Sequence, residues 1–294
     1  MINILVCTDN NYIIPLAALL NSLKESARSN KIIIHWFALE ISNSNIKKIK
    51  KLSNSLCYKI KVYAFFGSKI SSKFFTSGRI TSAAYLRLYL ADRLKDVSKV
   101  LYLDCDMIVL GDIKDLWSYD ISRYIAAVVK DAEGTNLNHL GKLRPKTYFN
   151  SGMMLINIDQ WKKERIQNKL FNLLDQNIHF RFHDQDLLNL TLNNKTLFIE
   201  PKWNLIPSRE NKYVIKYYAM IARLHLEKVF TLNTIIHYAA SKKPWHFLSS
   251  HPLKFLWWKH LRRTEFSHFI PEDKNFFNIF FKICPKPLRF LLSK

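Results

Sequence analysis

The sequence predicts an α/β fold, and three observations support this prediction. Residues 2–8 form an apolar run, residues 9–12 are polar, and residues 13–23 carry apolar side chains at helical spacing. A strand, a polar turn and a helix in this order open the α/β units that bind ligands beyond the carboxyl end of the strand. The run from 100 to 110 is apolar apart from two aspartates, which is typical of a strand that helices cover on both faces. With 294 residues, 48% of them hydrophobic, the chain has material for one large domain or two small ones.

The remaining elements follow from the periodicity of apolar side chains and from polar or glycine-bounded stretches. Further strands are predicted at 32–39, 59–66, 124–129, 153–158, 197–199 and 233–238. Helices are predicted at 45–52, 81–94, 112–117 and 187–192, and from Asp159 onward. Loops are predicted at 68–77 and 133–146, with a turn at 201–204.

The cysteines and the N-terminus indicate the compartment. The four cysteines show no CxxC pairing or metal-ligand spacing, so we expect reduced thiols in a cytosolic protein; they are Cys7, Cys57, Cys105 and Cys284. The N-terminus lacks a basic region before its short apolar run, which favours a first strand over a signal peptide. No apolar run approaches the roughly 18 to 20 residues of a spanning helix, so we expect a soluble or peripherally attached protein.

Two carboxylates, Asp104 and Asp106, interrupt the most apolar run of the chain. Burying an unpaired charge costs several kcal/mol, so a buried pair must take up protons or hold a cation. Residues i and i+2 of a strand point to the same side, so both carboxylates can reach one ion at the strand's end, with Cys105 pointing away. Alternatively the strand ends at Leu103 and both aspartates are solvated. The return to apolar residues at 107–110 favours the ion.

Other polar residues near predicted strand ends each allow a functional and a structural interpretation. Asp9 and Asn11 follow the first strand, where they suit hydrogen bonds to a base or ribose, or a helix cap and turn. Arg87, on the helix before the aspartate strand, suits a carboxylate or phosphate partner, or a surface ion pair. His237 near the end of the last strand is a core residue or a third metal ligand. The run 183–186 places a histidine, two aspartates and a glutamine at a predicted helix start, which suits a functional site. Alternatively, an aspartate there only caps the helix.

The scarcity of glycine excludes two common classes of nucleotide-binding protein. The chain has six glycines and neither a GxGxxG nor a Walker pattern. A dehydrogenase-type dinucleotide fold and a P-loop are therefore not expected.

Charge and aromatic residues concentrate late in the chain. The formal net charge is +22, which favours anionic partners such as nucleic acid, an anionic membrane or an anionic substrate. From Lys242 to the end there are eleven lysines or arginines, three acidic residues and twelve phenylalanines or tryptophans. This mixture suits the surface of an anionic membrane, where aromatic rings bury and cations meet headgroups. Nucleic-acid stacking and a packed subdomain with a basic exterior remain alternatives.

Taken together, these motifs resemble glycosyltransferase family 8, and most closely its bacterial lipopolysaccharide and lipooligosaccharide galactosyl- and glucosyltransferases. The resemblance spans roughly residues 1–246 in the family's motif order. It is carried by Asp9 with Asn11, 81–87, 100–110, 149–152, 183–186, 237–238 and 243–246. It implies a GT-A fold, meaning one Rossmann-like nucleotide-binding domain with a mixed central sheet. It also implies a UDP-hexose donor, dependence on Mn²⁺ and transfer with retention.

The resemblance also implies roles at matching positions. Asp104, Asp106 and His237 would bind Mn²⁺, with Mg²⁺ as an alternative. Donor binding is implied for Cys7, Asp9, Asn11, Arg87, Asp104, Cys105, Asp106, Asp131, Ala240 and Lys243, and catalytic roles around the donor sugar for Asn150, Asp184 and Gln185. The family often has glycine at the position of Ala240, so this loop is expected to sit slightly differently. An amide such as Gln185 is a poor nucleophile, which favours same-face attack by the acceptor over a covalent intermediate.

The sequence therefore predicts an enzyme that moves glucose or galactose from UDP-hexose onto a lipopolysaccharide or lipooligosaccharide core or a similar glycan. Residues 1–250 would form the catalytic domain and residues 251–294 a basic, aromatic, helical segment that associates with the membrane. The expected location is the inner face of the cytoplasmic membrane, with no nucleic acid as partner. A nucleic-acid-binding protein and a metal-dependent nucleotidyltransferase are the alternatives.

Overall fold

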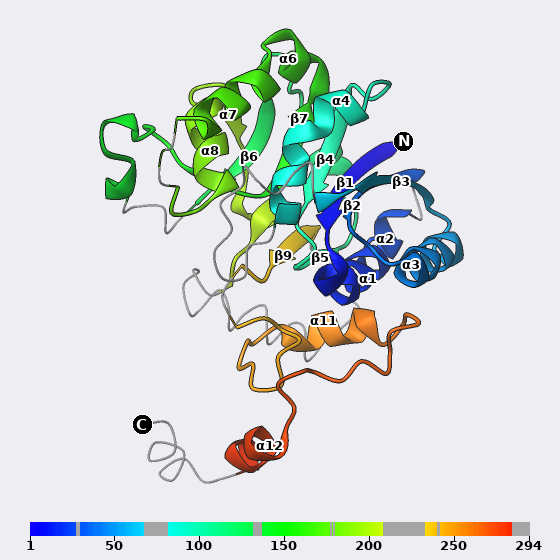
Figure 1. Ribbon diagram of the computed structural model, residues 1–294. Coiled ribbons are helices and arrows are strands. Elements are labelled where there is room, and N and C mark those ends of the chain that lie inside the picture. Colours follow the sequence, from blue (N-terminus) through cyan, green and yellow to red (C-terminus); the bar gives the residue numbers. More distant parts are fainter. Residues whose placement is uncertain are drawn as a thin grey trace.

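The computed structural model describes residues 1–27, 30–67, 82–131, 137–176, 178, 180–207, 233–239 and 242–283. It shows a seven-stranded mixed sheet with helices on both faces and a second, two-stranded sheet (Figure 1). The α/β fold predicted from the sequence is thus confirmed. The loop predicted at 68–77 lies outside the described residues.

The N-terminal third contributes three parallel strands to the large sheet, and β1 also pairs in parallel with a later strand. Its strands β1 (Ile2–Thr8), β2 (Ile32–Leu39) and β3 (Lys59–Phe65) pair in parallel register, with the helices α1 (Ile13–Ser22), α2 (Lys24–Ala27) and α3 (Asn43–Ser55) between them. Alternate residues of β1 enter different cores, since Ile4 and Val6 pack on one face and Leu5 on the other. Both faces of this strand are therefore buried, as the apolar run predicts.

The aspartate segment does not form one continuous strand. It divides into β4 (Lys99–Leu103) in the large sheet and β5 (Met107–Leu110), which pairs with β9 (Thr234–His237) in the small sheet. The chain turns at residues 104–106 to pass from one sheet to the other. The strand thus ends at Leu103, yet Asp106 is only 6% exposed, so the alternative of solvated turn residues is wrong for it.

One strand of the large sheet runs against its neighbours. The sheet order is β3-β2-β1-β4-β7-β6-β8, and β7 (Phe149–Asn157) is antiparallel to both β4 and β6 (Ala126–Lys130). This reversal brings the start of β7 to the edge where β1 and β4 end. Asn150, Ser151 and Gly152 lie inside this strand instead of preceding it, because backbone pairing with β6 extends to Phe149.

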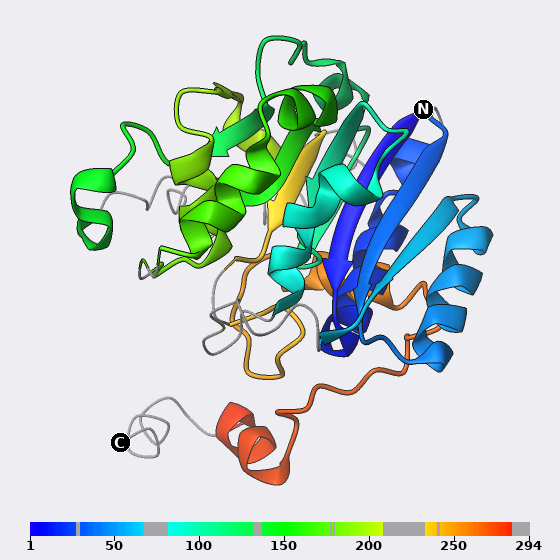
Figure 2. The same cartoon turned by 45° about the horizontal axis from the view of Figure 1, so that its top comes forward.

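The other elements cover the sheet or close its edge. The 3₁₀ helices are η1 (Asn10–Tyr12), η4 (Ser82–Tyr89), η5 (Asn138–Leu143) and η6 (Pro201–Asn204). The α-helices of this part are α4 (Leu90–Arg93), α5 (Lys114–Ser118), α6 (Ile158–Lys163), α7 (Ile166–Leu174) and α8 (Asp184–Thr191). Strand β8 (Thr196–Phe198) forms one edge of the large sheet. The helix predicted at 81–94 is thus a 3₁₀ helix followed by one α-helical turn. Figure 2 shows α6, α7 and α8 over the part of the sheet that holds β6 and β7.

The C-terminal part contains two helices with different surroundings. Helix α11 (Lys254–Leu261) packs against α1, and its residues Leu256, Trp257 and Leu261 belong to the same core as β1. Helix α12 (Phe276–Ile283) projects from the body in both views (Figures 1 and 2), and its Lys282 donates to the carbonyl of Phe247 at 3.1 Å. The core therefore continues across the boundary predicted at 250/251. Among the described helices, none has the length and apolar character to cross a membrane.

Candidate active site

The polar residues singled out by the sequence gather around a cavity of about 390 Å³ where β1 and β4 end and β7 begins. The predicted residues that line it are Cys7, Asp9, Arg87, Asp104, Cys105, Asp106, Asn150, Asp184, Gln185, His237 and Lys243. Residues up to 236 positions apart in the sequence, Cys7 and Lys243, therefore share one site.

Two predicted residues, Asn11 and Asp131, occupy other positions. Asn11 does not line the cavity, and its backbone N–H donates to Oδ1 of Asp9 at 2.9 Å, which is the cap-and-turn arrangement. Asp131 lies behind Gln185 and accepts a hydrogen bond from its Nε2. Ala240 lies outside the described residues.

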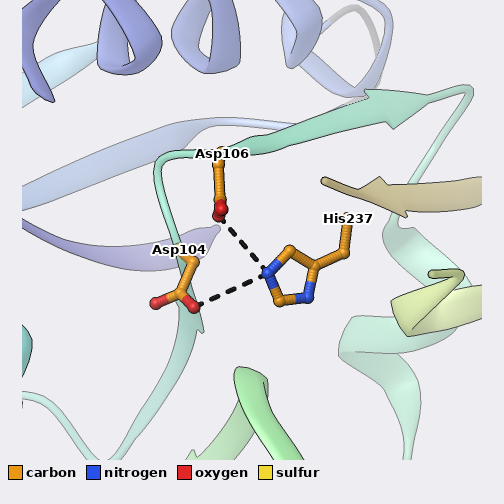
Figure 3. Close-up of side chains that lie close together, drawn as sticks. All are labelled: Asp104, Asp106 and His237. Carbon is orange, nitrogen blue, oxygen red and sulfur yellow. Dashed lines mark ion pairs between the residues drawn. The ribbon is translucent and has the colours of Figure 1, made fainter. Parts of the chain in front are cut away.

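Asp104, Asp106 and His237 form a compact cluster in the cavity wall (Figure 3). Nε2 of His237 lies 3.3 Å from Oδ1 of Asp106 and 3.8 Å from Oδ2 of Asp104. One ligand atom from each residue lies within 4.8 Å of the others. Two carboxylates with an imidazole suit Mn²⁺, whereas Mg²⁺ prefers oxygen ligands alone. The donor set therefore fits a divalent ion of the Mn²⁺ type.

Backbone hydrogen bonds from both sheets hold this cluster in place. The N–H of Asp104 donates to the carbonyl of Gly152 on β7 at 2.8 Å, and the N–H of Tyr238 donates to the carbonyl of Asp106 at 3.0 Å. Antiparallel pairing of β5 with β9 places His237 opposite the residue that follows Asp106. The turn between the sheets is thus fixed at both ends, and its carboxylates cannot move apart freely.

The carboxylates of Asp104 and Asp106 lie in different electrostatic environments. Burial raises the pKa of Asp104, against the opposing effect of Arg87. Burial also acts to raise the pKa of Asp106, but the Lys243 ammonium and His237 outweigh it and hold that pKa well below its usual range. Nζ of Lys243 lies 2.5 Å from Oδ2 of Asp106 and donates to the carbonyl of Tyr238 at 2.9 Å. Asp106 is therefore ionised in the folded protein.

Arg87 is buried and lies between the carboxylates of Asp104 and Asp184. Its side chain is 3% exposed, and its Nη2 lies 2.5 Å from Oδ2 of Asp184 and 3.7 Å from Oδ1 of Asp104. Nη1 donates to the carbonyl of Ser151 at 2.6 Å, and the guanidinium stacks 4.1 Å above the ring of Tyr102. The interpretation of Arg87 as a surface ion pair is thus wrong, because it faces the cavity from η4.

Asp184 and Gln185 enter the cavity from the start of α8. Burial raises the pKa of Asp184 to about 6, against the opposing effect of Arg87. Oε1 of Gln185 accepts from Nδ2 of Asn150 and from the N–H of Ser151, both at 3.1 Å. Gln185 is thus held in one orientation, with its carbonyl oxygen already engaged.

Several residues of the site carry no signal in the sequence. Tyr102 donates to Oδ1 of Asp104 at 2.6 Å, and Oδ1 of Asn204 lies 2.9 Å from Nδ1 of His237. Tyr102 looks like one more apolar strand residue, and Asn204 looks like a turn residue. Phe182 also lines the cavity. Only the spatial arrangement distinguishes these residues from others of their type.

Comparison with known proteins identifies the family. The family model described as glycosyl transferase family 8 matches residues 3–249. General stress protein A of Bacillus subtilis is 27% identical over 284 residues, covering 93% of this chain and 94% of that protein. Lipopolysaccharide 1,2-glucosyltransferase of Escherichia coli K12 is 26% identical over 258 residues, covering 85% and 75%.

The fold has solved counterparts. The crystal structure of the galactosyltransferase LgtC in complex with donor and acceptor sugar analogues superposes with a TM-score of 0.75 at 22% identity, covering 92% of this chain and 98% of that one. This likeness establishes a GT-A type of fold with a mixed central sheet. The match over residues 3–249 decides between the enzyme and the nucleic-acid-binding alternative. The chain belongs to glycosyltransferase family 8, a family of retaining hexosyltransferases.

Proposed function

We propose that this protein transfers glucose or galactose from a UDP-hexose to a lipopolysaccharide or lipooligosaccharide core or a similar glycan, forming an α-linkage with the help of Mn²⁺. The observation that carries the proposal is the cluster of Asp104, Asp106 and His237 in the wall of a cavity that also presents Lys243 and Arg87. A diphosphate donor needs both a divalent ion and further cations beside it.

The metal ligands of the proposal are Asp104, Asp106 and His237. Members of family 8 typically use a divalent metal, and the donor atoms here fit one. When bound, the ion stabilises the negative charge that develops on the leaving UDP. The two carboxylates would bind the ion beside the diphosphate. His237 would contribute a neutral nitrogen ligand, which favours Mn²⁺ over Mg²⁺.

Lys243 and Arg87 assist from opposite sides of the carboxylates. The Lys243 ammonium, beside Asp106, is placed to donate to the diphosphate. Arg87 bridges Asp184 to the neighbourhood of Asp104 and so orients Asp184 toward the hydroxyls of the donor sugar. Cys7, Asp9 and Cys105 line the cavity where β1 ends, next to the position proposed for the uridine.

Same-face attack by the acceptor hydroxyl accounts best for retention at this site. The oxygen of Gln185 already accepts two hydrogen bonds, and an amide is a poor nucleophile. Asp184, the nearby carboxylate, is paired with Arg87 at 2.5 Å and is therefore poorly placed to attack. The leaving phosphate would take the acceptor's proton. Mass-spectrometric detection of a glycosyl adduct on Asp184 would contradict this route.

The acceptor and the membrane form the second half of the proposal. Exposed phenylalanines on α12 include Phe276 at 86% and Phe277 at 56%, and Lys282 lies on the same helix. We infer that residues 251–294 hold the enzyme on an anionic membrane at the cytoplasmic side, with α12 as the inserting element. The similar protein of E. coli K12 is a lipopolysaccharide 1,2-glucosyltransferase, which supports an acceptor in lipopolysaccharide.

A panel of UDP-sugars with Mn²⁺ tests the proposal. UDP release would be measured with and without rough lipopolysaccharide, for the wild type and for Asp104→Asn. We expect turnover with UDP-glucose or UDP-galactose, stimulation by the acceptor, and loss of both in the variant. Absence of turnover with every UDP-sugar would refute the proposed donor. Turnover that needs no metal would refute the proposed role of the aspartates.

A further inference from the structure

A continuous chain of side-chain hydrogen bonds connects His237 to the far side of the cavity. Nδ1 of His237 lies 2.9 Å from Oδ1 of Asn204, and Nδ2 of Asn204 lies 2.8 Å from Oδ1 of Asn150. Nδ2 of Asn150 in turn lies 3.1 Å from Oε1 of Gln185. Asn204, Asn150 and His237 are at most 6% exposed, so water does not satisfy these groups instead.

The donor and acceptor roles along this series of hydrogen bonds are fixed by neighbouring groups that can only donate or only accept. The N–H of Gly152 donates to Oδ1 of Asn150, and the N–H of Ser151 donates to Oε1 of Gln185, both at 3.1 Å. A backbone N–H only donates, so these two atoms must be oxygens. At the end of the chain, the Asp131 carboxylate accepts from Nε2 of Gln185 at 3.2 Å. Rotating the carboxamide of Asn150 or of Gln185 by half a turn would place its NH₂ group against a backbone N–H. Each carboxamide therefore has one orientation.

Asn204 consequently has one permitted orientation. Because Asn150 presents an oxygen, Asn204 must present its NH₂ group to Asn150 and its oxygen to His237. An oxygen facing Nδ1 requires that Nδ1 carries the proton. In the neutral imidazole Nε2 is then the unprotonated nitrogen, and it is the atom that faces Asp104 and Asp106.

This orientation opposes what the carboxylates alone would favour. Two carboxylate oxygens beside Nε2 attract a proton to that nitrogen, and a protonated Nε2 has no lone pair for a metal. We propose that Asn204 is a positioning residue that holds His237 in its Nδ1-protonated tautomer and so keeps Nε2 available as a metal ligand. The inference rests on the metal site of the proposed function.

The backbone around Asn204 gives it the rigidity that this role requires. The N–H of Leu205 donates to the carbonyl of Ile235 at 2.9 Å, and the N–H of His237 donates to the carbonyl of Leu205 at 2.8 Å. The residue after Asn204 is thus hydrogen-bonded on both sides to β9. Asn204 and His237 cannot separate without breaking this pairing.

Nitrogen NMR of histidine-labelled, metal-free protein reports the tautomer directly. At a pH where the imidazole is neutral, we expect a protonated Nδ1 and a bare Nε2 for His237, assigned by loss of its signals in His237→Gln. Asn204→Ala should shift the proton toward Nε2 and weaken Mn²⁺ binding, measured by titration of the metal alone, by roughly 10- to 100-fold.

Asn21→Ala is the matched control, because Oδ1 of Asn21 lies 3.2 Å from Nδ1 of buried His260 and neither residue lines the cavity. It should leave Mn²⁺ binding unchanged. An unaltered tautomer and unaltered Mn²⁺ affinity in folded Asn204→Ala would overturn the inference, as would a bare Nδ1 and a protonated Nε2 in the neutral His237 of the wild type. Unchanged Mn²⁺ binding in His237→Gln would instead overturn the proposed metal site, and the NMR result would still decide the role of Asn204.

Discussion

Gly152 lies so close to His237 that a Cβ atom added to it would stand 2.4 Å from Cε1 of the imidazole. The same atom would stand 2.8 Å from Oδ2 of Asp104. We predict that Gly152→Ala moves the imidazole away from the carboxylates, because the backbone of both strands is held by hydrogen bonds. Mn²⁺ affinity should fall by roughly tenfold or more, as measured by titration with the metal alone.

Gly67→Ala is the control for this substitution. Its added Cβ would stand 2.7 Å from Oε1 of Glu40, which is a comparably short contact. Glu40 is exposed and can swing away, so this variant should bind Mn²⁺ as the wild type does. Equal behaviour of the two variants would contradict the importance of the contact between Gly152 and His237.

Removing the ammonium of Lys243 should weaken the use of the donor. A hydrogen bond to a charged group contributes about 1.5–3 kcal/mol, so Lys243→Met should lower kcat/KM for UDP-hexose by roughly 10- to 150-fold. Steady-state kinetics across donor concentrations measures this loss. Lys242→Met changes the exposed neighbour and should stay near wild type. A loss of the same size in both variants would indicate a general charge effect instead.

Stability should decline in acid because of a buried histidine. His260 is 3% exposed, and burial, assisted by Lys259 and Arg263, lowers its pKa to about 3 from 6.5. Between these values the unfolded chain holds a proton that the folded chain does not, so the free energy of unfolding falls as pH decreases. The slope from this group is at most about 1.4 kcal/mol per pH unit.

His260→Gln removes this contribution and should lose less stability between pH 7 and pH 5 than the wild type. Urea unfolding at a series of pH values measures both slopes. Parallel curves for the two proteins in this range would show that His260 does not account for the acid sensitivity.

Helix α12 should control membrane association without affecting the chemistry. Serine at Phe276, Phe277 and Phe280, which are 86%, 56% and 49% exposed, removes apolar surface that lies away from the cavity. Burying one such side chain contributes about 1.5–3 kcal/mol, so binding to anionic vesicles should fall at least roughly tenfold. UDP-hexose hydrolysis should stay within about twofold, since none of the three residues lines the cavity. Phe198→Ser, at an exposed ring on β8, is the control and should keep vesicle binding.

Much of the fold was predictable because its strands are long apolar runs with clear ends. The observed β1 and β2 have the bounds 2–8 and 32–39 that the sequence predicts. The division of the aspartate segment was not predictable, because an apolar run looks the same whether it stays in one sheet or passes to another. Likewise, α11 is as basic and aromatic as α12, and only its packing against α1 distinguishes a core helix from an exposed one.

The candidate site was predictable where the residue types are chemically unusual for their surroundings. Carboxylates in an apolar run attract attention, and Asp104, Asp106 and His237 do meet in the structure. Asn204 could not be identified, since an asparagine in a turn after proline is common and its contacts depend on strand pairing. The sequence also could not distinguish capping from ligand binding for Asp9 and Asn11, because both roles use the same side chains.

The reversed direction of β7 constrains how this enzyme can diversify. Asn150 lines the cavity and a Cβ added to Gly152 would face His237, so the start of β7 contributes to the site. The strand pairs with β4 and, across an irregularity after Asn150, with β6. An insertion or deletion of one residue within Phe149–Asn157 would exchange the inward and outward side chains beyond that point of the strand. Sugar preference in relatives built this way should therefore change by exchange of amino acids in β7, whereas changes in chain length would be confined to the connections outside it.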